Sequence, residues 1–308
     1  MSASETTITV EHASARLVRK PWGSHDLHPW SSLKPGVAAV GEIWFERAVM
    51  NAPDAALRLK LLFANEALSI QVHPDDAFAR SIGMPRGKTE AWYILSETCN
   101  AKVAVGLKWR LTTQQLRTSI EDGSIADMVC WQHVRSGDII FVPAGTIHAI
   151  GPGLVIAEIQ QRSDATFRLF DFGRQRELHV DSAVAVAYAR PAIAQAVSRR
   201  LTDARTLLIA CPYFVFERIG LLQNSIWQLN AASETWLLVL EGHARVGPVT
   251  LFVGDAAFQD TDRATIQVGT DNFSGLIAYQ GTEPTQGLLN ALTDRESDFS
   301  IHAVEALS

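Results

Sequence analysis

Two stretches of this sequence place polar, metal-binding types of side chain on strands that would otherwise be apolar. In "ALSIQVHPDD", Gln71 and His73 lie two positions apart, so on a strand both side chains point to the same face. In "GDIIFVPAGTIHAI", Pro143 and Gly145 predict a tight turn, and the strand after it presents His148 inward. Imidazole nitrogens and amide oxygens are groups that a borderline divalent metal ion can accept as ligands.

The spacing of glycine, proline, glycine and histidine in the second stretch resembles the second sequence motif of the cupin family. Cupins are small β-barrels that hold one metal ion inside. The resemblance implies that Gln71, His73, Glu90 and His148 surround one ion per chain, Zn²⁺ or another divalent metal. Taken alone, each residue has an ordinary explanation, such as a satisfied histidine or a charge at a strand edge. Their order and spacing together favour a metal site.

A closer resemblance covers about residues 16–180. The stretches "LSIQVHPDD", "GKTEAWYIL", "VPAGTIHAIG" and "EIQQRSDATFRLFDFGR" are similar, in this order, to type I mannose-6-phosphate isomerases in their short bacterial form. The stretches "PWGSHDL", "GEIW" and "RLKLLFA" agree with further blocks of that zinc-dependent family. The resemblance implies that mannose 6-phosphate and fructose 6-phosphate are interconverted by moving a proton between C1 and C2 through a cis-enediol. It also implies that the four residues named above are the zinc ligands.

The same resemblance assigns catalytic roles to Arg168, Lys88 and Glu158. Arg168 could stabilise negative charge on phosphate or enediolate, whereas the ordinary alternative is a surface ion pair. Lys88 lies two residues before Glu90 and shares its face if the strand has already begun. Glu158 lies in an apolar strand and could be the general acid or base, with burial raising its pKa or cations lowering it.

Three cations are predicted to bind substrate: Lys60, Lys88 and Arg168. Lys60 is a lone cation inside the apolar run "LRLKLLF", where burial without a partner would cost free energy. A position facing the pocket is therefore favoured over the alternative, in which the lysine snorkels to the surface. Asp164 is expected to cap a turn or to orient Arg168.

Strand patterns dominate the sequence and predict a mainly β fold. Short β-branched or aromatic runs are separated by turn residues along most of the chain. Helical spacing of apolar residues, after threonines suited to an N-cap, predicts one helix over residues 112–131. A second short helix is predicted over residues 75–83, with Asp75 or Asp76 as its N-cap.

A weak internal repeat predicts two copies of one β-unit. "EAWYIL" resembles "ETWLLV", which sets Glu234 against Glu90, and "SGDIIF" resembles "VGDAAF". Continuing the second match sets Thr265 against His148, so the second copy lacks the histidine partners of a metal site. With the cupin resemblance, the expectation is two jelly-roll-like barrels with a small helical insertion. The expected division is a catalytic domain at 1–180, a connector at 181–210 and a degenerate second cupin domain at 211–308.

Composition limits the classes of partner and the compartment. The 308 residues include 27 Lys and Arg against 33 Asp and Glu, a formal charge of −6 that offers no overall field for nucleic acid. We expect no membrane segment, because no apolar run is long enough, and no signal peptide. Three widely spaced cysteines without a CxxC pattern favour reduced thiols and a cytoplasmic location. The expected partner is a small sugar phosphate, and the oligomeric state is open.

Two other functions fit part of the pattern. The same ligands could hold Fe²⁺ in a bicupin oxidoreductase, although dioxygen chemistry does not need the cations of a phosphate site. A sugar-binding cupin without catalysis is the third hypothesis, although a binding module does not need a complete ligand set.

Overall fold

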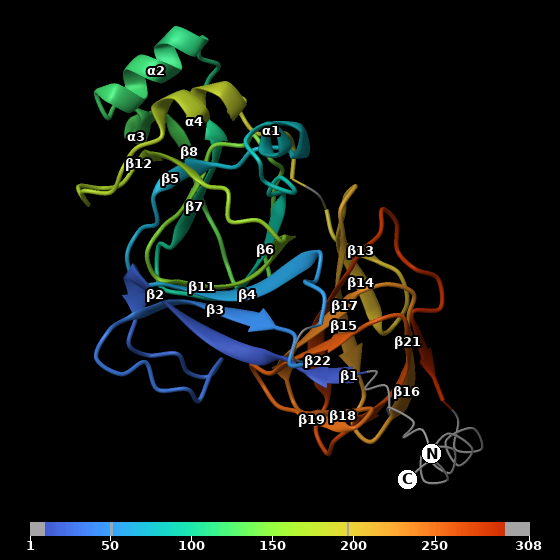
Figure 1. Cartoon of the computed structure of the whole chain (residues 1–308). Coiled ribbons are helices and arrows are strands. Elements are labelled where there is room, and N and C mark those ends of the chain that lie inside the picture. The colour runs from blue at the N-terminus through green and yellow to red at the C-terminus, as the bar shows by residue number, and fades with distance from the viewer. Residues whose placement is uncertain (1–9, 50–51, 196, 293–308) are drawn as a thin grey trace, which may run out of the picture.

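The computed structural model describes residues 10–49, 52–195 and 197–292, which form four β-sheets and four short helices (Figure 1). The predicted mainly β class is confirmed. Two of the sheets come almost entirely from the first half of the chain and two from the second. Over the described ranges, no helix has both the length and the apolar character needed to cross a membrane.

The first half builds two sheets around an apolar core. The six-stranded sheet runs in the order β2 (Ser14–Ser24), β3 (Val40–Glu46), β4 (Leu57–Ala64), β11 (Leu154–Gln161), β6 (Glu90–Glu97) and β9 (Ile139–Val142). The five-stranded sheet runs in the order β12 (Phe167–Phe170), β5 (Ile70–Val72), β10 (His148–Ile150), β7 (Lys102–Leu107) and β8 (Val129–His133). Side chains such as Trp92, Val103 and Ile150 from facing strands pack in one buried cluster between them.

Three of the four helices cover the outer face of the five-stranded sheet. The helices are α1 (Asp76–Ser81), α2 (Thr113–Glu121), α3 (Ile125–Met128) and α4 (Val180–Val186). Residues of α2, α3 and α4 pack on the sheet in a second apolar cluster, and Figure 1 shows these three helices stacked together above it.

The predicted helices begin where expected, but the longer one ends early. Asp75 caps α1, and Thr112 caps α2 in a reciprocal capping box with Gln115. The expectation of a continuous helix over 112–131 is wrong beyond residue 121. Gly123 has a φ of +81°, which ends α2, and after the single turn of α3 the chain enters strand β8.

The second half also builds two sheets. The seven-stranded sheet runs in the order β1 (Val10–His12), β20 (Ala256–Gln259), β17 (Thr235–Glu241), β22 (Phe273–Tyr279), β15 (Val215–Leu221), β14 (Arg205–Ala210) and β13 (Arg199–Arg200). The five-stranded sheet runs in the order β19 (Val249–Leu251), β18 (Ala244–Val246), β21 (Asp262–Val268), β16 (Ile226–Ala231) and β23 (Leu289–Ala291). The N-terminal segment thus contributes β1 to the second half, and the predicted connector 181–210 contains β13 and β14.

The six-stranded and seven-stranded sheets pack face to face, and this contact joins the two halves. Leu59 and Leu61 of β4 lie in one buried cluster with Phe216 and Trp236 from the other sheet. The neighbouring residue Leu62 points the opposite way, into the core of the first half. Because successive strand residues alternate between faces, β4 is buried on both sides and carries both cores.

The repeat has a counterpart in strand pairing, but in a different register. Strand β6 pairs with β9 and β11, just as β17 pairs with β20 and β22. Tyr93 lies opposite Ile139, and Leu238 lies opposite the corresponding Ala256. Tyr93 therefore corresponds to Leu238, and three residues earlier on each strand Glu90 corresponds to Thr235. The predicted match of Glu90 with Glu234 is therefore wrong by one residue, and a one-residue shift reverses the face of every side chain.

A closed polar network occupies the interior of the second half. Arg205 donates from Nε and Nη2 to the two carboxylate oxygens of Glu217 at 2.8 and 2.7 Å. The hydroxyl of Tyr279 donates to Glu217 Oε1 at 2.6 Å and accepts from the backbone N–H of Thr285 at 2.9 Å. Arg205 Nη1 reaches the carbonyl of Thr285 at 3.0 Å. These buried groups are satisfied by one another, so they form a structural network.

Candidate metal centre and active-site cavity

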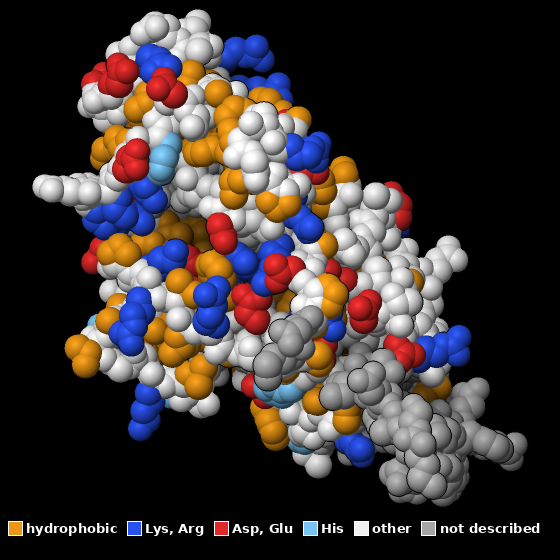
Figure 2. Space-filling view, viewed as in Figure 1, with side chains coloured by type: hydrophobic (Ala, Val, Ile, Leu, Met, Phe, Trp, Pro, Cys, Tyr) orange, Lys and Arg blue, Asp and Glu red, His pale blue; other side chains and the backbone are white. Residues whose placement is uncertain are grey.

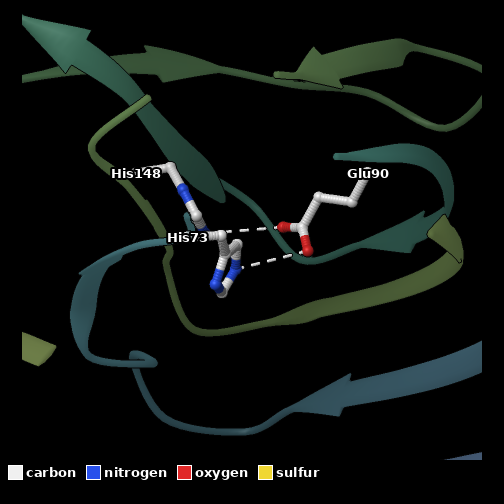
Figure 3. Close-up of side chains that lie close together, drawn as sticks. All are labelled: His73, Glu90 and His148. Atoms are coloured by element: carbon white, nitrogen blue, oxygen red, sulfur yellow. Dashed lines mark ion pairs between the residues drawn. The ribbon is translucent and has the colours of Figure 1, made fainter. Parts of the chain in front are cut away.

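Two histidines and a glutamate from three segments meet inside the first half. His73 follows β5, while Glu90 and His148 are the first residues of β6 and β10. Their ligand atoms all lie within 4.8 Å of one another. Figure 3 shows the Glu90 carboxylate facing both rings, with Oε2 3.4 Å from His73 Nε2 and Oε1 3.4 Å from His148 Nε2. The three side chains are buried, and rigid strands carry Glu90 and His148.

Backbone carbonyls fix the state of both imidazoles. The Nδ1 atoms of His73 and His148 lie 2.8 Å from the carbonyl oxygens of Ala165 and Thr146. Because a carbonyl can only accept, each Nδ1 carries the proton and each Nε2 keeps a lone pair that faces Glu90. Burial lowers the pKa of both rings, that of His73 to about 3 with a further contribution from Lys88. Neutral imidazoles held in this way are the form that binds metal ions.

The carboxylate also suits a cation. Burial raises the pKa of Glu90, but the nearby charge of Lys88 outweighs burial and holds the pKa well below its ordinary value. Its Oε1 accepts from the indole of Trp92 at 3.1 Å. Its Oε2 is buried and accepts no hydrogen bond of good geometry, although Lys88 Nζ lies 2.8 Å away. A charged, buried carboxylate whose two oxygens each face the lone pair of an imidazole fits a metal ion.

Gln71 lies beside this group, as predicted from its spacing. It is opposite His148 across the β5–β10 pair, and its Nε2 lies 3.3 Å from His148 Nε2. Its Oε1 accepts from the hydroxyl of Ser69 at 3.1 Å. Rotating the amide would exchange the two atoms, turning the oxygen toward the histidines and the nitrogen toward Ser69. The role of Gln71 as a ligand stays a prediction.

A cavity of about 440 Å³ opens directly above the group. Figure 2 shows the face on which basic and acidic side chains lie intermingled around a hollow near the middle of the molecule. Residues predicted from the sequence that line the cavity are Lys60, Gln71, Lys88, Glu90, Glu158, Asp164 and Arg168. His73 and His148 are each 1% exposed and are not among the lining residues. The structure thus brings the predicted site residues together, with the two histidines buried next to those that line the cavity.

Strand register places lysines and glutamates alternately along the cavity wall. Lys60 lies opposite Glu158 across the β4–β11 pair, and its Nζ is 3.3 Å from Glu158 and 3.7 Å from Glu42. Lys88 Nζ is 4.0 Å from Glu158 as well as 2.8 Å from Glu90. Lys60 is 5% exposed, so it does not snorkel to the surface. Each buried cation therefore has carboxylate partners that offset its desolvation.

The environments of the carboxylates push their pKa values in opposite directions. Burial, and next the nearby Glu90 charge, raise the pKa of Glu158 against the opposing effect of Lys60 and Lys88. Burial also raises the pKa of Glu42, but Lys60 and Lys20 outweigh it and lower the pKa overall. The direction for Glu158, which the sequence left open, is therefore upward. Two nearby carboxyl groups with opposite shifts are typical of acid–base sites.

Arg168 lies at the mouth of the cavity on β12. It is opposite Gln71 in the β5–β12 pair, and its Nη1 donates to the carbonyl of Glu177 at 2.7 Å. Its Nε is buried without a hydrogen-bond partner. The expectation that Asp164 orients Arg168 is wrong, because Asp164 instead pairs with Arg58 Nη1 at 2.5 Å.

Sequence reasoning missed several residues that line the cavity. These are Lys20, Trp22, Glu42, Trp44, Arg176, Glu177 and His179. Glu42 and Trp44 alternate along β3 in "GEIWFE", the same pattern of a polar residue in a buried strand that singled out Lys60. The indole of Trp44 donates to Glu42 Oε2 at 2.5 Å, and its ring lies 4.1 Å from the guanidinium of Arg58. The alternation could have found both residues.

Comparison with known proteins identifies the relatives of the chain. No protein-family model matches it. It is 35% identical over 198 residues to the mannose-6-phosphate isomerase of Streptococcus mutans, which is 62% of each chain. It is 37% identical over 169 residues to a mannose-6-phosphate isomerase of Bacillus subtilis, which is 51% of this chain and 53% of that one.

This chain is a homologue of the mannose-6-phosphate isomerases. The predicted resemblance is thereby confirmed. The matches span about half to six tenths of the length of these curated relatives.

Solved structures extend the similarity in fold. The crystal structure of the mannose 6-phosphate isomerase from Bacillus subtilis superposes with a TM-score of 0.77 and 24% identity, over 88% of this chain and 99% of that one. A putative mannosephosphate isomerase from Archaeoglobus fulgidus superposes with a TM-score of 0.69 and 16% identity, over 88% and 97%. The fold of mannose-6-phosphate isomerases therefore extends over both halves of this chain.

The geometry predicts that Glu90 is essential for metal binding. Glu90→Ala should retain less than about a tenth of the metal of the wild-type chain, because the variant loses the charged ligand between the two imidazoles. Metal content is measured by inductively coupled plasma mass spectrometry after dialysis. Glu121→Ala, on the exposed end of α2, is the matched control and should keep its metal. Equal metal content in the two variants would contradict the site.

Proposed function

We propose that this protein is a metal-dependent aldose–ketose isomerase that interconverts mannose 6-phosphate and fructose 6-phosphate. The observation that carries the proposal is the contact between Lys88 and Glu90, which joins the buried histidine–carboxylate group to the charged cavity above it. The homology to mannose-6-phosphate isomerases supplies the substrate.

We propose Zn²⁺ as the native ion, one per chain, held by Gln71, His73, Glu90 and His148. Two neutral imidazoles, one carboxylate and one amide oxygen suit this metal. When bound, the ion supplies a Lewis acid that polarises the oxygen at C1 or C2 of the sugar. The cavity volume of about 440 Å³ is of the size that small-molecule sites have.

The residues of the cavity would carry out the remaining steps. Glu158, with its raised pKa, would move the proton between C1 and C2 as the general acid or base. Lys88 is held in its charged form, because Glu90 and Glu158 outweigh the effect of burial and raise its pKa. Charged Lys88 and Lys60 would stabilise the negative charge of the enediolate. Arg168, at the mouth, would bind the phosphate through its guanidinium.

We further infer that the two pairs of sheets are two cupin barrels, a catalytic one and a degenerate one. The degenerate barrel includes β1 from the proposed catalytic domain 1–180 and β13 and β14 from the proposed connector 181–210, in addition to the strands of the proposed domain 211–308. The pairing of β6, β9 and β11 with its counterpart in β17, β20 and β22 supports two related units. We place the enzyme in the cytoplasm. Cys99, Cys130 and Cys211 are free, as thiols are in a reducing compartment.

A coupled assay on mannose 6-phosphate tests the function directly. Chelation should abolish the formation of fructose 6-phosphate, and adding Zn²⁺ back should restore it, because the Lewis acid is required. Metal content and rate are measured on the same samples. Metal-replete protein that forms no fructose 6-phosphate would overturn the assignment of substrate.

Arg168 should be needed for turnover but not for the metal. Arg168→Ala is expected to lower kcat/KM on the order of a hundredfold, because a charged donor to the substrate is lost. The metal content should stay at the wild-type level. Arg110→Ala removes an exposed guanidinium outside the cavity and should leave kcat/KM unchanged. A loss of metal in Arg168→Ala would show instead that this residue supports the centre.

The dependence of kcat/KM on pH should report the ionisation of the Glu158 carboxyl group. Because its pKa is raised, its carboxylate form exists only above that pKa, and a rate that needs the base falls as the pH drops through it. The acid limb of kcat/KM should therefore lie above the ordinary carboxylate range. Glu158→Gln should lower kcat by about 10²–10⁴ and remove that limb. An unchanged acid limb in this variant would assign it to another group.

A further inference from the structure

A buried carboxylate of the second half, Glu234, binds the backbone at the start of β4 in the first half. This residue precedes β17 and is 8% exposed. Its Oε2 accepts from the backbone N–H of Ala56 at 2.5 Å, and its Oε1 accepts from the N–H of Leu57 at 2.8 Å. The indole of Trp236 donates to Oε1 at 3.1 Å. We name this group of contacts the Glu234 clamp.

The clamp holds the start of the strand that carries Lys60. Leu57 is the first residue of β4, and Lys60 lies three residues further along the same strand. Unpaired N–H groups at a buried strand end are costly, so the carboxylate fixes where β4 begins. The position of Lys60 against Glu158 depends on that register.

The segment that delivers Lys88 is attached at the same point. The carbonyl of Ala56 accepts from Arg86 Nη1 at 2.8 Å and from the backbone N–H of Arg162 at 2.8 Å. Arg86 lies two residues before Lys88 in the chain. Ala56 thus joins both lysine-bearing segments to one anion from the other half of the molecule.

We propose that Glu234 is a positioning residue through which the second half sets the geometry of Lys60 and Lys88. The inference rests on the proposed function of the cavity and assigns the second half a role in it. Glu234 does not contact the substrate cavity itself. It acts through the backbone of Ala56 and Leu57.

The chain offers a matched control in Glu11. This residue lies in β1 of the same seven-stranded sheet and is 4% exposed. Its Oε2 accepts from the backbone N–H groups of Ala48 and Val49 at 2.8 and 3.2 Å. Both carboxylates therefore hold two successive amides of the first half, but Ala48 and Val49 follow the end of β3 and do not lead into a lysine of the cavity.

The test compares Glu234→Gln with Glu11→Gln in the full-length, metal-replete chain. Glutamine keeps the size of the side chain, but its NH₂ group cannot accept from a backbone N–H. Glu11 also pairs with Arg47 Nη2 at 2.6 Å, so Glu11→Gln should lose at least as much thermal stability as Glu234→Gln. Both variants should keep their metal. Only Glu234→Gln should lower kcat/KM for mannose 6-phosphate, by about tenfold or more, because small displacements of catalytic groups reduce the rate strongly.

A second measurement does not depend on the substrate. The rate of acetylation of Lys60 and Lys88, relative to exposed Lys108, is followed by mass spectrometry. Glu234→Gln should raise the ratio about threefold or more as β4 opens locally, whereas Glu11→Gln should not. If Glu234→Gln does not fold, Arg86→Gln removes the donor to Ala56 and should give a smaller change of the same kind.

Equal effects of Glu234→Gln and Glu11→Gln on acetylation would overturn the proposal, as would an unchanged kcat/KM in Glu234→Gln when the wild type is active. If the wild-type chain does not isomerise mannose 6-phosphate, the proposed function fails, and the acetylation ratio alone decides whether Glu234 positions the lysines.

Discussion

Charge buried in an apolar interior is the constraint on which the rest of the molecule depends. Glu90 is ionised and 1% exposed, so its desolvation must be offset by groups of opposite charge or by a metal ion. Lys88 offsets it in part and needs a second carboxylate, Glu158, which in turn faces Lys60. The alternation ends at Lys20, whose side chain is 32% exposed and reaches water. The cavity is thus a chain of compensated charges that leads from the centre to solvent.

The six-stranded sheet can hold this row of alternating charges because one of its faces lines the cavity and the other packs against apolar side chains. Lys60 and Glu158 point to the cavity, while Leu59 and Ile159 next to them pack against the seven-stranded sheet. A face packed at the density of a protein interior resists displacement. The large apolar contact with the second half therefore provides a rigid support for charged groups that repel and attract one another a few ångströms away.

Much of the site followed from local rules, whereas longer-range register did not. Two-residue alternation was enough to place Gln71 beside the histidines and Lys60 in the cavity, because a strand fixes the face of each side chain. The same rule places Glu42 and Trp44 on the cavity face of β3. Nothing local to Asp164 reveals its partner, because that partner, Arg58, lies on β4, far away in the sequence. Such contacts depend on tertiary packing that a single sequence does not encode locally.

The match of Glu234 to Glu90 failed for a related reason. Similar residue types at similar spacing do not determine the register in which strands pair. The strand partners show that the counterpart of Glu90 is Thr235. The end of α2 was also missed, although Gly123 marks it, because apolar spacing continued beyond the glycine.

The Arg205–Glu217–Tyr279 network has a consequence for the history and the engineering of the second half. Its members occupy the interior of that half and satisfy one another. Changing Glu217 alone would therefore leave the buried guanidinium of Arg205 without its carboxylate, and changing Arg205 alone would leave the carboxylate of Glu217 without its cation. A route by single substitutions that removes Arg205 or Glu217 must pass through an intermediate with an unpaired buried charge. Laboratory evolution by single substitutions is therefore expected to alter ligand binding in the first half and to leave the interior of the second half unchanged. Only a simultaneous replacement of all three residues would make room for a ligand there.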